Sequence, residues 1–232
     1  MTNSLMNFRT IAIAASVAAT LSFAACSSDS DSPDDVADIN TADPDATMTF
    51  FLTSNSPGDG GNLGGLAGAD VHCASLAEAA GTTGEEWRAY LSTTGADGIN
   101  AIDRIGTGPW INALGVTVAT SAENLLSDSN NLTLETALTE NGAPVNGIGE
   151  VPNRHDILTG TELNGLASLS ATDTTCNNWT SNSAGFALVG HHDRVGGGSN
   201  PTSWSTAHST SGCSQSNFQA LGGDGLFYCF AM

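Results

Sequence analysis

The chain has 232 residues, of which 24 are Asp or Glu and five are Arg, and it contains no Lys, so its formal net charge is −19. This charge argues against nucleic acids, heparin-like polyanions and anionic lipid surfaces as partners, because each requires clustered cations. The lack of Lys excludes Walker-type phosphate binding and Schiff-base chemistry, whereas a hydrophobic fraction of 40% is enough for a folded core.

The N-terminus, residues 1–25, has the features of a bacterial secretory signal peptide. Arg9 precedes an apolar stretch that is shorter than the ~20 residues needed to span a bilayer. The small residues immediately before Cys26 are similar to a lipobox, in which the Cys thiol is acylated and becomes the new N-terminus, with Phe23 in place of the usual Leu. The alternative is an ordinary cleavage site with a free Cys26. We expect lipidation at Cys26. By resemblance to Gram-negative lipoproteins, the Ser27 that follows favours the outer membrane of the bacterial cell envelope.

Residues 26–47 form an acidic segment. From Ser27 to Thr47 the chain has seven Asp and two Pro, with few large apolar side chains. Such a composition buries too little apolar surface to offset the entropy of ordering, and its charges repel one another. We therefore expect a disordered tether between the lipid and one domain at residues 48–232. A calcium site is the alternative, but the ligand spacing and Gly of an EF-hand loop are missing.

The domain is predicted to combine one long helix with several short strands. In residues 66–80, small and apolar side chains recur at steps of three and four, which is typical of one buried helical face, and Gly81 is a natural stop. Cys73 lies on that face, and Asp70 is expected to cap or face the helix N-terminus, where its charge suits the helix dipole. Strands are predicted at residues 48–53, 87–91, 115–119, 155–160, 185–189 and 226–230, with a long excursion at 139–153. The predicted fold class is α+β with long loops.

Four cysteines remain besides Cys26, namely Cys73, Cys176, Cys213 and Cys229. An even number in an exported domain predicts two disulfides, for which three connectivities are possible. No pair has the C-x-x-C spacing, so neither a zinc knuckle nor a thioredoxin-type redox site is indicated.

Several short motifs follow one another between residues 48 and 230. They are Gly-Gly-Leu-Ala-Gly-Ala-Asp at 64–70, Trp-Arg-Ala-Tyr-Leu-Ser at 87–92, Asp-Arg at 103–104, Thr-Gly-Thr at 159–161, Asn-Gly at 164–165, Cys-Asn-Asn-Trp-Thr at 176–180 and Phe-Tyr-Cys-Phe at 227–230. In this order they resemble the endostatin family, which comprises the C-terminal domain released from certain collagens and similar bacterial lipoproteins. We expect the adjacent Asp103 and Arg104 to form a structural ion pair.

This resemblance implies a C-type-lectin-like fold and nested disulfides, Cys73 with Cys229 and Cys176 with Cys213. Heparin binding, which endostatin performs through Arg clusters, is not implied, because the Arg residues here are scattered. Endostatin's zinc site uses His near the N-terminus, where this chain has Asp and Ser. The Glu-Pro-Asn motif of sugar-binding C-type lectins is interrupted by Val151. No metal ion or other cofactor is therefore predicted.

The candidate ligand-binding residues are aromatic and histidine side chains in the loop-rich half, residues 139–223. Trp179 and Trp204 are either core anchors or exposed binding residues. His191 and His192 belong to the densest run of titratable residues, but adjacent strand residues point to opposite faces. A zinc site that adds His155, Asp156 and His208 is the alternative, although its spacing matches no standard set. The proposed binding set is Trp179, His191, His192, Trp204 and His208.

The functional expectation is a non-enzymatic binding or adhesion module for a glycan or protein ligand on the cell surface. Aromatic faces amid Ser, Thr, Asn and Gly suit uncharged polar ligands, and no G-x-S-x-G elbow or H-E-x-x-H motif is present. The alternatives are an envelope structural protein without a soluble ligand and a metal-dependent hydrolase.

Overall fold

The computed structural model describes residues 42–170 and 172–232. The predicted signal peptide, the lipidation site Cys26 and the tether up to residue 41 lie outside the described residues. Within the described ranges, no helix combines the length and the apolar character that crossing a membrane requires.

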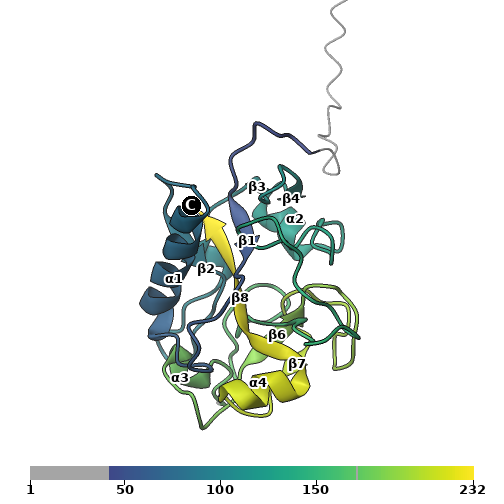
Figure 1. The fold of residues 1–232 in the computed structure, drawn as a ribbon. Coiled ribbons are helices and arrows are strands. Elements are labelled where there is room, and N and C mark those ends of the chain that lie inside the picture. The colour runs from purple at the N-terminus through teal and green to yellow at the C-terminus, as the bar shows by residue number, and fades with distance from the viewer. Residues whose placement is uncertain (1–41, 171) are drawn as a thin grey trace, which may run out of the picture. The chain divides into compact units, whose positions relative to one another are not determined.

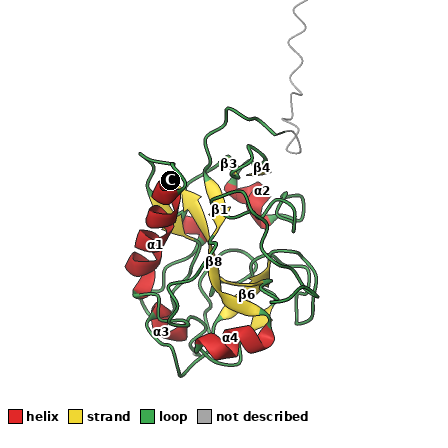
Figure 2. Cartoon of the chain, viewed as in Figure 1, coloured by secondary structure: helices red, strands yellow, loops and turns green. Residues whose placement is uncertain are grey.

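The described chain mixes short helices and strands with long loops, which confirms the mixed helix and strand composition (Figures 1 and 2). In chain order the elements are β1 (Phe50–Leu52), α1 (Gly65–Ala79), β2 (Trp87–Ala89), a 3-10 turn (Ile102–Arg104), β3 (Trp110–Ile111), β4 (Thr117–Ala119), α2 (Ala122–Leu126), β5 (Asp156–Leu158), α3 (Cys176–Trp179), β6 (Leu188–His191), β7 (His208–Ser209), α4 (Gln215–Leu221) and β8 (Gly223–Ala231). The predicted strands at 115–119 and 185–189 are confirmed with shifted ends.

The last strand, β8, organises the main sheet (Figure 1). One half of β8 pairs antiparallel with β1 and β2, and Cys229 lies opposite Phe51 on one side and Ala89 on the other. The other half pairs in parallel with β5, which leads on to β6 and β7. The sheet order is therefore β1-β8-β5-β6-β7, with β2 also on β8, while β3 and β4 form a separate pair.

Alternation along β8 divides the core into two clusters. Phe227, Cys229 and Ala231 join the cluster that includes the buried face of α1, whereas Tyr228 and Phe230 join the cluster that includes β4 and α2. Side chains two residues apart share one face of a strand, so an almost wholly apolar strand supplies both sides of the sheet. This explains why β8 is buried along nearly its entire length.

Helix α1 follows the predicted range within one residue. Its buried residues, Ala69, Cys73 and Ala77, recur at steps of four, so small side chains form the face that approaches the sheet. Gly81, just after the helix, has a φ of +88°, a left-handed conformation that glycine adopts without steric cost.

The two disulfides confirm the nested pairing. Cys73 bonds to Cys229 across 156 positions and Cys176 bonds to Cys213 across 37, and in each bridge the Cα atoms are 5.7 Å apart. The outer bridge ties α1 to β8, and the inner bridge ties α3 to the segment before α4. Both ends of the domain are thus covalently joined through the core.

Asp70 does not cap α1, and Asp103 does not pair with Arg104, so both of these expectations are wrong. Asp70 lies beyond the first helical turn, and its carboxylate accepts hydrogen bonds from Arg88 Nη1 at 2.8 Å, from the Ala89 amide at 2.9 Å and from Arg104 Nη2 at 2.7 Å. Adjacent residues in a helical turn do not face each other, so Arg104 reaches back to Asp70 while Asp103 accepts from a neighbouring Asn. Asp70 therefore joins α1, β2 and the 3-10 turn.

Asp70→Ala is expected to lower the free energy of unfolding by about 3 kcal/mol, because it leaves the nearly buried guanidinium of Arg104 without its anion. The side chain of Arg104 is 9% exposed and that of Arg88 is 36% exposed. Arg88→Ala, the matched control, should cost no more than about 1 kcal/mol. Urea denaturation of the three proteins measures the difference, and equal losses would contradict the central role of Asp70.

Candidate functional site

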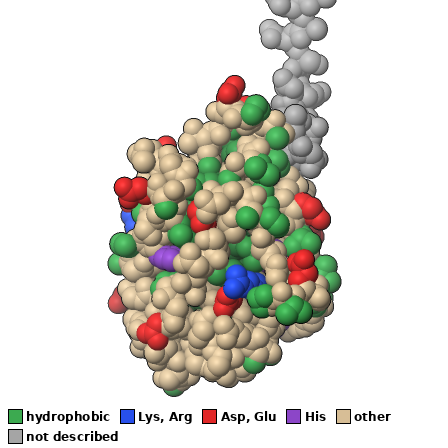
Figure 3. Space-filling model, in the orientation of Figure 1, with side chains coloured by type: hydrophobic (Ala, Val, Ile, Leu, Met, Phe, Trp, Pro, Cys, Tyr) green, Lys and Arg blue, Asp and Glu red, His purple; other side chains and the backbone are tan. Residues whose placement is uncertain are grey.

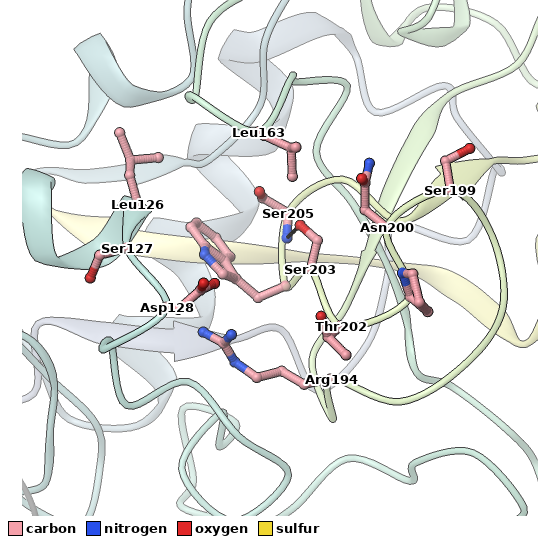
Figure 4. Close-up of a pocket in the computed structure, with 12 residues that line it drawn as sticks. Leu126, Ser127, Asp128, Leu163, Arg194, Ser199, Asn200, Thr202, Ser203 and Ser205 are labelled. Atoms are coloured by element: carbon pink, nitrogen blue, oxygen red, sulfur yellow. Dashed lines mark hydrogen bonds between the residues drawn. The ribbon is translucent and has the colours of Figure 1, made fainter.

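A polar cleft lies in the loop-rich half of the domain, between the end of α2 and the loop that joins β6 to β7 (Figure 4). Its volume is about 440 Å³. Six hydroxyl or amide side chains line it, namely Ser127, Ser199, Asn200, Thr202, Ser203 and Ser205. Leu126, beside Ser127, and Leu163, near Ser205, add apolar side chains to the lining (Figure 4). The cleft therefore offers many short hydrogen-bonding groups beside a small apolar surface.

The cleft contains one cation and one anion, Arg194 and Asp128. Arg194 adopts a positive φ of 55°, its Nε donates to the carbonyl of Leu132 at 2.6 Å, and Nη2 donates to Asn130 Oδ1. Burial is the main reason why the pKa of Arg194 is lowered, and nearby Asp128 partly opposes that effect. The guanidinium thus holds two loops together, and the opposite charges leave the cleft close to neutral.

Trp204 lines the cleft but is almost wholly buried. It is 4% exposed, its indole N–H donates to the carbonyl of Leu125 at 3.1 Å, and its ring packs against Tyr90 and Tyr228 at 4.9 and 5.3 Å. A ligand in the cleft can therefore contact only a small part of this side chain. The expectation of an exposed Trp204 is corrected accordingly.

Trp179 is a core residue, which corrects the expectation that it binds a ligand. Its side chain is fully buried, it belongs to the cluster beneath α1, and its indole N–H donates to the carbonyl of Ser92 at 2.7 Å. No ligand can reach a side chain without exposed surface. Its polar N–H is satisfied inside the protein, as is usual for buried Trp.

A cluster of three histidines around one carboxylate lies at the ends of the three strands β5, β6 and β7. All three imidazoles approach the same oxygen, Asp156 Oδ1. It lies 3.2 Å from Nε2 of His155 and 3.3 Å from Nε2 of both His191 and His208. The sheet creates this convergence, because Asp156 on β5 lies opposite His191 on β6, and β7, which begins at His208, pairs with β6. The rings of His155 and His191 stack at 4.3 Å.

The other ring nitrogen of each histidine faces a hydrogen-bond acceptor. Because carbonyl and carboxylate oxygens only accept, each Nδ1 must carry a proton, so a ring in its neutral form has the lone pair on Nε2. The carboxylate partner, Asp193, has a pKa lowered to about 2, since its bonds to His155 and to backbone amides outweigh the effect of burial. The acceptors are Asp193 Oδ1 for His155 at 3.3 Å, the carbonyl of Pro201 for His191 at 2.8 Å and the carbonyl of Ser209 for His208 at 3.1 Å.

The centre of the cluster lacks hydrogen bonds although it is buried. Asp156 is 3% exposed and His191 is fully buried, yet Oδ1 and Oδ2 of Asp156 and Nε2 of His191 have no hydrogen-bond partner within the described chain. Burial raises the pKa of Asp156, but the nearby imidazoles of His191 and His208 outweigh it and lower the pKa overall. One ligand atom each from His155, Asp156 and His191 lies within 4.8 Å of the others, a spacing that could hold a metal ion.

His192 does not join this cluster. It is fully buried, its Nε2 lies 3.3 Å from the carbonyl of Asn146, and burial lowers its pKa. This is the alternation expected of adjacent residues at the end of a strand. Of the five predicted binding residues, the fold brings together His191 and His208, while Trp204 lines the neighbouring cleft and the other two lie elsewhere.

No protein-family model matches this sequence, and a search of curated proteins likewise found no match. The function is therefore inferred from the cleft and the histidine cluster themselves.

Proposed function

We propose that this protein is an exported binding module, anchored in the bacterial envelope through lipid on Cys26, which recognises an uncharged polar ligand in the cleft beside α2. A glycan and a polar loop of another protein share the required chemistry. The observation that carries the proposal is the row of hydroxyl and amide groups from residues 199–205, which lines a cavity of about 440 Å³ together with Leu126 and Leu163. Ligand sites typically measure about 300–1,000 Å³ and combine apolar walls with a few polar groups.

The charges in the cleft and the net charge of the chain both favour an uncharged ligand. Within the cleft, Arg194 and Asp128 offset each other, and the whole chain carries a net charge of −19, which repels polyanions at long range. Figure 3 shows only small patches of basic side chains on the face that it presents. Polar groups of the ligand would therefore be recognised by hydrogen bonds instead of by ion pairs.

The make-up of the cleft favours binding over catalysis. Its lining has one carboxylate, Asp128, and no His, Lys, Cys or Glu. Hydrolysis commonly requires a nucleophile with an adjacent base, or a pair of acid and base groups. A lone exposed carboxylate beside serine hydroxyls provides neither.

We further propose that the domain has a C-type-lectin-like fold of the endostatin type. The nested disulfides, the placement of α1 against the last strand and the long loops beyond β5 support this assignment. Fold by itself does not identify a ligand, so the functional proposal rests on the cleft.

The test uses the full mature chain, extracted in detergent and labelled, on an array of neutral glycans with immobilised heparin for comparison. Thr202 and Thr107 are both exposed, and only Thr202 lines the cleft. We expect Thr202→Arg to weaken glycan binding by about tenfold or more, a loss of roughly 1.4 kcal/mol, because the long side chain fills the cleft. Thr107→Arg adds the same charge elsewhere and should have no effect. Intact mass should show acylation at residue 26.

Tight, salt-sensitive retention on heparin would contradict the proposal, as would equal effects of the two variants. Binding to no glycan on the array and to no protein in an envelope extract would favour an envelope structural role without a soluble ligand.

A further inference from the structure

We infer that His155, Asp156, His191 and His208 form a Zn²⁺ site, and that the bound ion holds both ends of the loop at residues 192–207 that lines the cleft. The inference goes beyond the proposed function, because it rests on the histidine cluster and does not require that the cleft bind any particular ligand.

The three distances from Asp156 match those between neighbouring donors of a tetrahedral ion. Zn²⁺ binds His nitrogen and carboxylate oxygen at about 2.0–2.2 Å, so two ligand atoms on neighbouring corners of the tetrahedron lie roughly 3.4 Å apart. The three distances from Asp156 Oδ1 to the imidazole Nε2 atoms are 3.2, 3.3 and 3.3 Å. Three imidazoles and one carboxylate are a donor set that suits Zn²⁺, whereas Ca²⁺ and Mg²⁺ prefer oxygen ligands.

The hydrogen bonds around the cluster also suit the binding of a cation by the three Nε2 atoms. In zinc sites the second ring nitrogen of each ligating His usually donates to a carboxylate or a backbone carbonyl, which orients the ring and fixes the proton. All three imidazoles have such an acceptor on Nδ1, and for His155 it is the carboxylate of Asp193. In the neutral form of each ring, Nε2 is therefore available to bind a metal ion.

A network of hydrogen-bonded imidazolium rings explains the geometry less well. Such a network would share its donors between both oxygens of Asp156 and align them. Here all three nitrogens converge on Oδ1, none forms a hydrogen bond to it, and Oδ2 also lacks a partner among the described residues. A buried polar atom left without a partner costs about 1–3 kcal/mol, and a metal ion at the centre would satisfy Oδ1 and the imidazole nitrogens at once.

The site is closed, so its role is structural. Donor atoms of His155, Asp156 and His191 lie within 4.8 Å of one another. With His208 as the fourth donor the tetrahedron would be complete, whereas catalytic zinc sites keep one position for water. The side chains of His155, Asp156 and His191 are 5%, 2% and 0% exposed, and only His208, at 23%, connects the site to solvent. His208 therefore provides the entry path for the ion.

The ion would connect the sheet to the cleft. His191 ends β6 and His208 begins β7, so two ligands enclose the loop that carries Arg194 and the hydroxyl groups of the cleft. The Nδ1–H of His191 also donates to Pro201, within that loop. Gly196 lies so close that a Cβ there would be 2.5 Å from Cε1 of His191. Closing the loop at its base reduces its conformational freedom.

The experiment uses the full chain in detergent, stripped with a chelator and then titrated calorimetrically with Zn²⁺ and spectroscopically with Co²⁺. We expect one equivalent of Zn²⁺ with a Kd below about 1 µM, and the intense visible absorption of tetrahedral Co²⁺. His208→Ala removes the most exposed of the proposed ligands and should weaken Zn²⁺ binding about 100-fold or more, since losing even a hydrogen-bond partner of a metal ligand costs 10–100-fold. His72→Ala, a histidine on α1 outside the cluster, is the matched control and should bind normally.

A second readout follows the loop directly. Trypsin cleaves after Arg, the chain has no Lys, and Arg194 lies inside the loop. Removing Zn²⁺ should speed cleavage at Arg194 by about tenfold or more, because local opening sets the rate, while cleavage at Arg88 in β2 should not change.

The inference is overturned if wild-type chain does not bind Zn²⁺, if Co²⁺ gives the weak absorption of an octahedral site, or if both His variants bind equally. Glycan binding can persist in each case, so failure here is distinguishable from failure of the proposed function.

Discussion

Replacing Cys73 and Cys229 together by Ala should lower the free energy of unfolding by up to about 5 kcal/mol. This bridge spans 156 positions, so removing it releases conformational entropy throughout the unfolded domain. The total stability of a domain is only about 5–15 kcal/mol, so the variant should be partly unfolded at physiological temperature. The small side chains on the buried face of α1 supply little apolar area, so the bridge is a principal link between α1 and β8.

The matched control removes the inner bridge, Cys176–Cys213, whose 37-position span corresponds to about 4 kcal/mol in the same chain-entropy estimate. Urea denaturation followed by Trp fluorescence measures both variants. A larger loss from the inner bridge would show that local strain or packing, and not the length of the closed loop, governs the stability of this domain.

Trp179→Ala should lower the free energy of unfolding by about 4 kcal/mol, because it leaves a large cavity in the core. The indole is fully buried and contacts Gly160 so closely that a Cβ at Gly160 would lie 2.7 Å from Cζ2 of Trp179. Trp179→Phe keeps most of the apolar contact but leaves the buried carbonyl of Ser92 without its donor, which should cost about 1–3 kcal/mol. Thermal and urea denaturation of the series measure these losses.

Glycan-array binding separates a core role from a binding role for this residue. Trp179→Phe should remain folded at low temperature and bind with unchanged affinity. A variant that keeps its stability but loses binding would contradict the structural role assigned to Trp179.

Local patterns in the sequence were sufficient for the elements whose geometry depends on near neighbours. The steps of three and four in residues 66–80 predicted α1 almost to its ends, because one helical face repeats with the period of the helix itself. The short apolar runs at 48–53 and 226–230 likewise predicted β1 and β8. The charge balance, the acidic composition of residues 27–47 and the even cysteine count needed no coordinates, and the nested pairing was predicted from a family resemblance.

Contacts between distant residues were decided only by the tertiary structure. Periodicity could not show that Arg104 reaches Asp70, nor that Trp179 lies wholly inside the core, because both depend on how separate elements pack. The spacing of His155, His191 and His208 matches no standard metal motif, and only the pairing of β5 with β6 and of β6 with β7 brings the three rings onto Asp156. The strand alternation that separates His191 from His192 was readable in the sequence, but the partner strands that complete the site were not, since a sheet joins residues by register and not by their order along the chain.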